Sequence, residues 1–220
     1  MVRRYYRPMT IGILGGTGPQ GRGLTRRLAA AGHSVVIGSR SAERAEEVAA
    51  AYAEVGPVRG GDNAEAARAD LVIITVPYEG HADLLRSLSA ELAGKIVVDC
   101  VNPLGFDKQG AFALTVEEGS AAQQAAAVLP DSRVTAAFHH VSAPLLMDLA
   151  VATVDLDVLV LGDDRHATDT VQALAGVIPG ARGIYGGRLR NARQVEALTA
   201  NLISINRRYK AHAGIRVTDV

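Results

Sequence analysis

The sequence contains no tryptophan, a single cysteine and only 4% aromatic residues. One cysteine, Cys100, excludes a disulfide within the chain and suits a reducing compartment, so we expect a cytoplasmic protein. The 23 basic side chains balance 23 acidic ones, which gives no electrostatic basis for binding nucleic acid or an anionic membrane. Because no apolar run reaches the length of a membrane span, we expect neither nucleic acid nor membrane as a partner.

The sequence also lacks the short motifs of several enzyme classes. It has no G-x-S-x-G elbow of a serine hydrolase, no H-E-x-x-H of a zinc protease and no C-x-x-C pair. No spaced cluster of His and Asp indicates a metal ion, so no metal site is predicted. Cys100 ends a predicted buried strand, and we interpret it as a small core residue.

A glycine-rich stretch, residues 15–21 (GGTGPQG), lies between an apolar run at residues 10–14 and a predicted helix at residues 20–31. A second apolar run follows the helix, and the whole has the size of a strand–helix–strand unit. In this context G-x-G-x-x-G spacing is typical of a dinucleotide site, although a plain glycine turn has the same spacing. A mononucleotide P-loop does not fit, because Arg22 and Gly23 stand where Lys and Ser or Thr would hold phosphate and magnesium.

Each glycine of this motif has a predicted task. Gly16 permits the tight turn, Gly18 lets the backbone approach a pyrophosphate, and Gly21 lets the helix pack closely on the strand. The free N–H groups and the positive dipole end of the helix then point at the phosphates. The predicted phosphate-binding residues are Gly16, Thr17, Gly18, Pro19, Gln20 and Gly21.

Strands and helices alternate beyond this unit. Helices are predicted at residues 45–52, 62–69, 80–88 and 120–128, and strands near Val58 and at residues 71–76, 95–100 and 133–138. Residues 104–117 show no regular period and are predicted to form a loop. Alternation of this kind predicts an α/β fold with a doubly wound parallel sheet, the Rossmann NADP-binding fold, and a small fused C-terminal α/β segment.

The pattern changes near residue 141. A strand at residues 158–161, a helix from Asp164 to Val177, a strand at residues 182–185 and a final helix at residues 191–209 are predicted. The final helix places Val195, Leu198, Leu202, Ile205 and Tyr209 along one apolar seam. We therefore divide the chain into a flexible extension (residues 1–9), a Rossmann domain (10–140) and a small C-terminal domain (141–220) that packs on the sheet and caps the cleft.

Ligands of doubly wound sheets bind beyond the carboxyl ends of the strands. The residues at those predicted ends are Gly16, Ser39, Val76, Pro77, Asn102 and His139, and we assign Val76, Pro77 and Asn102 to the cofactor site. His139 is followed by His140, and neighbouring side chains of an extended segment diverge. The two histidines are therefore not expected to serve one site.

The end of the second strand predicts which dinucleotide binds. An NAD site carries an acidic residue here for the ribose hydroxyls, but this chain has Ser39 and Arg40, with Arg44 one helical turn further on. These side chains suit the additional 2′-phosphate of NADP, because charge-assisted bonds from guanidinium groups stabilise a phosphate. We therefore predict NADP(H). The alternative is that both arginines are solvated residues at a helix start.

No acid and base pair is evident in the sequence. Hydride transfer from the nicotinamide is then the simplest chemistry, and it requires two rings held face to face in a dry pocket.

Several segments occur together in one family: Gly15–Gly18 with Gly21, Gly38–Arg40, Val76–Pro77, Phe138–His139 and Asn191–Thr199 (NARQVEALT). From Thr10 onward the chain resembles the NADPH:F-420 oxidoreductases, which pass a hydride between NADP(H) and coenzyme F-420, an 8-hydroxy-5-deazaflavin (F420 below). The glycine motif is shared with many reductases, whereas the C-terminal stretch is much more distinctive.

The resemblance implies roles for particular residues. NADP would be held by Thr17, Ser39, Arg40 and Arg44, with Ser39 and Arg40 at the 2′-phosphate. The deazaflavin site would be lined by His139, Arg193, Thr199 and Ile203, whose polar groups orient the ring and stabilise charge on it, with no covalent catalyst. Ala197 stands where some relatives have serine, so a hydroxyl contact is absent. A C-terminal cap over the cleft and a homodimer are also implied.

Two other functions fit part of the same pattern. One is another NADPH-dependent reductase on this fold, acting on flavin, a ferric chelate or a small imine. The other is a non-catalytic module that senses NADP and signals through a partner. The latter predicts a pocket too small or too wet for a second ring beside the nicotinamide.

Overall fold

The computed structural model describes residues 8–220, and among them the central sheet has eight strands: β1 (Thr10–Leu14), β2 (Ser34–Ser39), β3 (Val58–Asp62), β4 (Leu71–Ile74), β5 (Ile96–Asp99), β8 (Arg133–Ala136), β9 (Leu156–Gly162) and β10 (Ala181–Gly187). Their order is β10-β9-β8-β5-β4-β1-β2-β3. The six strands from β3 to β8 in this order are parallel. This arrangement confirms the predicted doubly wound fold.

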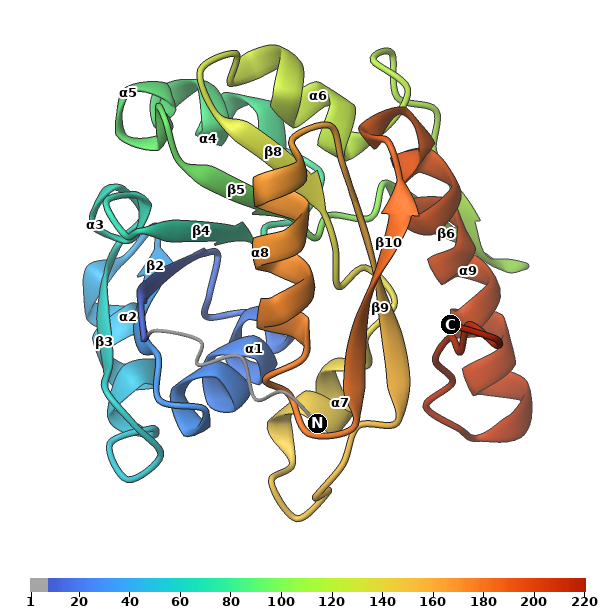
Figure 1. Cartoon of the computed structure of the whole chain (residues 1–220), viewed down its shortest axis with the longest axis horizontal. Helices are drawn as coiled ribbons and strands as arrows, with labels where there is room; N and C mark the ends of the chain where they lie inside the picture. Colours follow the sequence, from blue (N-terminus) through green and yellow to red (C-terminus); the bar gives the residue numbers. More distant parts are fainter. Residues whose placement is uncertain (1–7) are drawn as a thin grey trace.

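Helices cover both faces of the sheet (Figure 1). They are α1 (Pro19–Ala30), α2 (Ala42–Ala50), α3 (Asn63–Ala67), α4 (His81–Ser87), α5 (Ser89–Leu92), α6 (Ala121–Val128), α7 (Ala143–Met147), α8 (Arg165–Ala175), the 3-10 turn η1 (Leu189–Asn191) and α9 (Ala192–Tyr209). α1, α7 and α8 share one apolar core with the sheet, while α3 to α6 share another. Strands between them are buried on both faces, as β4 shows with four buried residues in succession.

The predicted N-terminal extension, residues 1–9, falls mostly outside the described residues. The carbonyl of Met9, the last residue of this extension, accepts a hydrogen bond from Ser34 N (3.2 Å). Met9 also packs against the core that contains α1. The chain is therefore joined to the sheet one residue before β1 begins.

The two C-terminal strands extend the same sheet. β9 pairs antiparallel with β8, and β10 pairs parallel with β9. The buried carboxylate of Asp157 in β9 accepts hydrogen bonds from Arg182 of β10 (2.7 Å), from Arg216 (2.7 Å) and from Val217 N (2.7 Å). Hydrogen bonding from Arg182 lowers the pKa of Asp157. The carboxylate thereby ties the end of the chain to the sheet.

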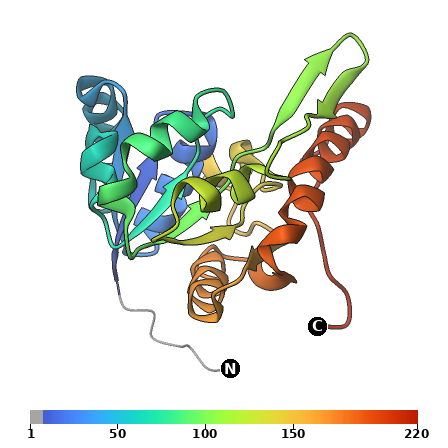
Figure 2. The ribbon, with the colours of Figure 1, turned by 90° about the horizontal axis from the view of Figure 1, so that it is seen from above.

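Residues 104–117 contain a β-hairpin, and the predicted loop is wrong here. β6 (Leu104–Asp107) pairs antiparallel with β7 (Gly110–Ala113). The Asp107 side chain accepts hydrogen bonds from Gln109 N and Gly110 N, and Gly110 has φ of 124°. These local contacts make the turn. The hairpin projects from the body of the protein beside α9, so its strands have no two-sided burial to impose a hydrophobic period (Figure 2).

The apolar seam predicted along α9 is buried only in part. Val195 and Leu202 are buried, but Ile205 and Tyr209 are 40% and 73% exposed. The prediction is therefore wrong beyond Leu202, because no described element covers the last turns of the helix. The hairpin adds an exposed phenylalanine, Phe106, on the neighbouring element.

A buried arginine joins α1 to the segment that contains α7. Arg27 is 4% exposed, and its guanidinium donates to the carbonyls of Leu145, Leu146, Asp148 and Val151 at 2.7 to 3.0 Å. Helix α1 comes close here, since a Cβ on Gly23 would lie 2.6 Å from Leu146 Cβ. This contact fixes where the chain turns back after β8.

We predict that Arg27→Met lowers the free energy of unfolding by about 3 kcal/mol, because it leaves buried carbonyls without their charged donor. Urea denaturation measures the change. The matched control is Arg26→Met, since the side chain of the adjacent Arg26 forms no hydrogen bond or ion pair with the described residues. Equal losses for the two variants would contradict a specific role of Arg27.

Candidate functional site

The glycine turn after β1 differs in one detail from the prediction. The left-handed backbone belongs to Gly15, whose φ is 70°, and not to Gly16. At Gly16 the requirement for glycine is steric, because the turn packs closely there and an added Cβ would lie 2.9 Å from Ile13 O. A Cβ on Gly21 would lie 2.5 Å from Gly16 Cα, as expected for a helix packed tightly on the turn.

Gly18 has no such internal reason to be glycine. Its φ is −77°, which any residue adopts, and the nearest atom to an added Cβ is Gly15 O at 3.5 Å. A side chain would therefore project into open space in front of the turn. A phosphate lying close to the backbone at this point explains the glycine, so the turn fits a pyrophosphate.

The start of α1 is free to bind an anion. No side chain of a described residue caps this end, and its first turn has no acidic residue. Thr17 and Pro19 flank Gly18 at the start of the helix. Gln20 is used differently, because its Nε2 donates to Phe138 O (3.2 Å) and thereby holds the chain after β8.

Two exposed arginines lie just beyond the end of β2. Ser39, the last residue of the strand, is buried, and its Oγ accepts a hydrogen bond from Ser41 N. Neither Arg40 nor Arg44 forms an ion pair with any residue that the structure describes. Both stand beside the N-terminus of α2, where a positive charge opposes the helix dipole. The arrangement suits a bound anion.

The end of β4 supports the glycine turn. Val76 packs close to Gly15, where an added Cβ would lie 2.7 Å from Val76 Cγ1, and Pro77 beside it is exposed. Sequence reasoning missed Asn63, which is buried and whose Oδ1 accepts a hydrogen bond from Gly15 N (3.3 Å). The sequence offers Asn63 only as an alternative to Asp62 for the cap of the predicted helix, and it is Asp62 that caps α3.

Three of the predicted site residues meet at one carbonyl group. The carbonyl of His139 accepts hydrogen bonds from Asn102 Nδ2 (3.0 Å) and Thr199 Oγ1 (3.3 Å). Thr199 Oγ1 also lies 3.3 Å from Asn102 Oδ1. The structure therefore brings together the segments that follow β5 and β8 with the middle of α9.

The two histidines diverge, as expected, because the chain bends sharply before them. Phe138 is fully buried and has φ of 64°, a strained value for this residue. The His139 ring is enclosed, and neither ring nitrogen has a hydrogen-bond partner among the described residues. His140 turns toward β9, where its Nε2 accepts weakly from Leu159 N (3.5 Å).

Burial lowers the pKa of His139 to about 4. The ring is therefore neutral at pH 7. Because the side chain has no exposed surface, His139 contributes its carbonyl to the site, and a direct contact of its ring with a ligand stays a prediction.

The structure assembles buried acidic and basic groups that sequence reasoning did not find. His81 Nε2 lies 2.7 Å from Asp99 Oδ2, and His81 Nδ1 lies 3.1 Å from Gln124 Oε1. The Glu196 carboxylate accepts hydrogen bonds from Ala121 N (2.9 Å) and Ala122 N at the start of α6. These residues are far apart in sequence and carry no common motif, so no spacing could have indicated them.

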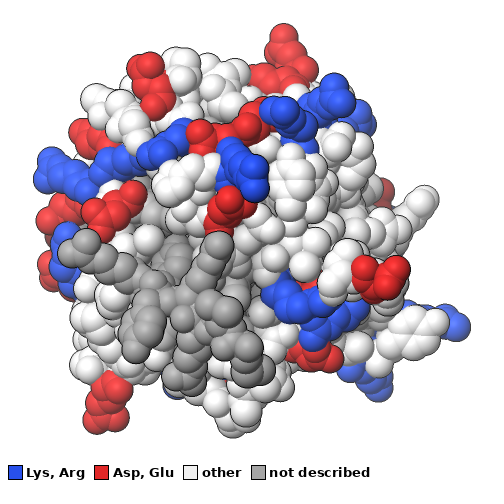
Figure 3. All heavy atoms as spheres, viewed as in Figure 1, with Lys and Arg blue, Asp and Glu red and all other residues white. Residues whose placement is uncertain are grey.

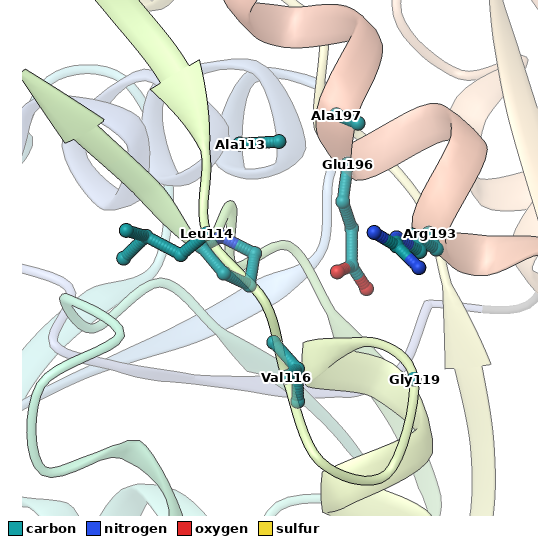
Figure 4. A pocket seen from close by; sticks show the side chains of 8 residues that line it. Ala113, Leu114, Val116, Gly119, Arg193, Glu196 and Ala197 are labelled. Atoms are coloured by element: carbon teal, nitrogen blue, oxygen red, sulfur yellow. The ribbon is translucent and has the colours of Figure 1, made fainter.

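A small hollow lies between α9, the base of the hairpin and the segment before α6 (Figure 4). Its lining includes Leu114, Val116, Gly119, Arg193, Glu196 and Ala197, and the enclosed space is only about 10 Å³. That volume is about the space that one water molecule needs, whereas ligand pockets usually have volumes of about 300 to 1,000 Å³. The hollow by itself therefore has room for about one water molecule and not for a ring system.

Arg193 and Glu196 line this hollow one helical turn apart on α9. Thr199 and Ile203 follow at the next two turns of the same face. Thr199 thus contacts Asn102, while Arg193 lies beside the hollow on the same helix. Ile203 is half-buried, and a ligand contact there stays a prediction.

Charges of both signs are interleaved on the face seen in Figure 3. None of the helices among residues 8–220 is long and apolar enough to cross a membrane. Within the same described range, no group of three or more His, Cys, Asp or Glu residues could hold a metal ion. Cys100 is buried, and burial raises the pKa of its thiol well above the usual value, in agreement with a core role.

Comparison with known proteins gives relatives over nearly the whole chain. A family model described as NADP oxidoreductase coenzyme F420-dependent matches residues 10–103. The F420-dependent NADP reductase of Methanothermobacter marburgensis is 41% identical over 223 residues, which cover 96% of this chain and 99% of that protein.

Two further relatives are informative. A crystal structure of a protein from Arthrobacter sp. FB24, described as an F420-dependent NADP-reductase, superposes with a TM-score of 0.81 at 27% identity and covers 96% of this chain and 99% of its own. The metalloreductase STEAP3 of Rattus norvegicus is 33% identical over 88% of this chain, which corresponds to 37% of that longer protein.

Proposed function

This chain belongs to the family of coenzyme F420-dependent NADP oxidoreductases, and we propose that it transfers a hydride between NADP(H) and coenzyme F420. The observation that carries the proposal is the 41% identity to an F420-dependent NADP reductase over 96% of the chain. The match therefore includes both the glycine turn and α9. In one direction the reaction is NADPH + F420 + H⁺ → NADP⁺ + reduced F420.

The NADP end of the site lies at β1 and β2. The backbone at Gly18 and the free N-terminus of α1 would bind the pyrophosphate, for which the open space at Gly18 supports the fit. Ser39, Arg40 and Arg44 would hold the 2′-phosphate. These contacts orient the nicotinamide toward the ends of β4, β5 and β8.

The deazaflavin end lies between the end of β8 and α9. Arg193 supplies a positive charge, and Thr199 and Asn102 hold the backbone of His139 in place. The small hollow beside Arg193 and Glu196 would border the ring. The protein's part in the reaction is to align two rings and exclude water, since hydride transfer needs near-attack geometry more than a nucleophile.

Each of the two proposed domains would bind one coenzyme. Residues 10–140 would bind NADP, and residues 141–220 would form the cap that places F420 over the nicotinamide. We also place the protein in the cytoplasm, where both coenzymes are available and the single thiol of Cys100 stays reduced.

Mixing the purified protein with NADPH and F420 is expected to remove the visible absorbance of F420. NADH at the same concentration should act at least about tenfold more slowly, since it lacks the 2′-phosphate. No loss of absorbance with either nucleotide, together with intact NADPH binding, would contradict the proposed function and favour a non-catalytic NADP-sensing module.

One further candidate function has support from a relative. The 33% identity to a metalloreductase favours reduction of a ferric chelate over reduction of free flavin or of an imine. The same assay distinguishes these three activities, with free flavin, a ferric chelate or a cyclic imine in place of F420. Faster NADPH oxidation with any of them than with F420 would replace the main proposal.

Arg40→Ala is expected to raise the dissociation constant of NADPH about 10- to 100-fold and to leave that of NADH nearly unchanged. The reason is the loss of one charge-assisted bond to phosphate, about 1.5 to 3 kcal/mol. Fluorescence titration of each nucleotide measures both constants. The control is Arg68→Ala, which removes an exposed arginine at the end of α3. If Arg40→Ala weakens the binding of NADPH and NADH equally, the NADP assignment is contradicted.

We further propose that the protein is a homodimer formed through the hairpin and the end of α9. Phe106 and Tyr209 are 70% and 73% exposed on these neighbouring elements. A two-stranded hairpin is marginally stable alone in water, so a second copy covering it would stabilise it. Sedimentation should give a dimer for the wild type and a monomer for Phe106→Asp, whereas Leu149→Asp, at another exposed leucine, should remain dimeric. A monomeric wild type would contradict the proposal.

A further inference from the structure

Four buried titratable side chains from separate elements lie near one another, and one of them, Glu196, lines the hollow. They are His81 of α4, Asp99 of β5, His139 after β8 and Glu196 of α9, and none is more than 5% exposed. His81 and Asp99 form a close pair, and His139 Nε2 lies 3.9 Å from Glu196 Oε1. Asp99 already forms an ion pair with His81, so Glu196 is not needed to neutralise the charge of His81.

Glu196 connects this buried cluster to the hollow. Figure 4 shows its carboxylate directed from α9 into the hollow, near Arg193 and facing the loop that contains Gly119. Two backbone N–H groups of α6 hold the carboxylate in place. Its position is therefore set by the fold, while the carboxylate borders a hollow with room for about one water molecule.

The charged groups around Glu196 determine its protonation. Asp99 faces it from β5 and His81 from α4, while Arg193 lines the same hollow from its own helix. On the segment before α6, Glu117 and Glu118 are exposed at the surface. Burial and, to a lesser extent, Asp99 raise the pKa of Glu196 to about 7, although the bonds from α6 lower it.

The neighbouring histidines do not cancel this effect. His139 is neutral, since burial lowers its pKa to about 4. Burial alone would lower the pKa of His81, but the contacts with Asp99 raise it. The positive charge of His81 therefore mainly stabilises the Asp99 carboxylate. Glu196 is thus the carboxyl group of this cluster whose pKa burial brings near neutral pH, while His81, with its pKa raised, is a second buried group that titrates.

The reaction under the proposed function exchanges one proton as well as a hydride, and this inference rests on that function. The hydride leaves nicotinamide C4 with two electrons and forms a C–H bond on the deazaflavin. The electron pair displaced across the deazaflavin ring forms an N–H bond with a proton. The proton has to come from a group at the dry end of the site, or from water admitted to it.

We propose that Glu196 holds this proton and delivers it through the hollow to the deazaflavin, directly or through one water molecule. The O–H bond of the carboxylic acid breaks, the ring N–H bond forms, and the carboxylate is protonated again from solvent at the mouth of the hollow. In the opposite direction the Glu196 carboxylate receives the proton. The neighbouring Asp99 and His81 allow Glu196 to change between its protonated and its ionised form.

Glu196→Gln tests this role, because the amide has nearly the same size and its oxygen can still accept one of the two hydrogen bonds from α6, but the side chain no longer titrates. We expect F420 reduction at pH 7 to slow about 100-fold, as for loss of a general acid. The decline of kcat above about pH 7 in the wild type should vanish in the variant, with KM for both substrates changed less than about threefold. Glu117→Gln removes an exposed carboxylate nearby and should retain the wild-type rate and pH profile.

A second readout needs neither substrate. In ligand-free protein labelled with ¹³C at the Glu carboxyl carbons, one signal should titrate near pH 7, be missing in Glu196→Gln and persist in Glu117→Gln. Titration of every carboxyl below about pH 5.5, or an unchanged rate and pH profile in Glu196→Gln, would overturn the inference while leaving the proposed function intact. If the wild type does not oxidise NADPH with F420, the proposed function fails, and this inference fails with it.

Discussion

The carbonyl oxygen of His139 accepts hydrogen bonds from Asn102 and Thr199, and this contact holds the two halves of the chain in one geometry. Asn102 follows β5, and Thr199 lies in the middle of α9. Phe138 must adopt a left-handed backbone just before this carbonyl, a strain that the surrounding packing has to compensate. The chain can then turn from β8 into α7, where the buried Arg27 anchors it to the helix that follows the glycine turn.

This junction explains how one sheet can hold two coenzymes. The nucleotide end of the cleft depends on backbone, since glycine turns and helix starts leave N–H groups free for phosphate. The other end depends on α9, which carries Arg193, Glu196 and Thr199 along one face. Because β9 and β10 continue the sheet, the C-terminal segment is part of the same sheet as the glycine turn.

Polarity inside the cleft is unevenly distributed. Under the proposed function, the phosphate end would rely on exposed arginines, for which solvent competes and salt screens the charge. His81, Asp99 and Glu196 have very little exposure, and there each charge is costly unless it is paired or protonated. Such buried groups would respond to the charge that develops on a neighbouring ligand, whereas the exposed arginines would mainly select which ligand binds.

The sequence alone was sufficient for features that are encoded locally. The glycine spacing, the hydrophobic periods of the strands and the absence of an acid beside Ser39 are each read within one segment, and they predicted the fold and the nucleotide. The distinctive stretch at Asn191–Thr199 indicated the second coenzyme. Only the tertiary structure decided that Asn63 supports Gly15, that residues 104–113 form a hairpin and that Glu196 meets Asp99 and His139. The hairpin joins residues close in sequence but has no two-sided burial that would give it a hydrophobic period. The other two contacts join residues that are distant in sequence, and their energy comes from burial and hydrogen bonds that exist only after the chain has folded.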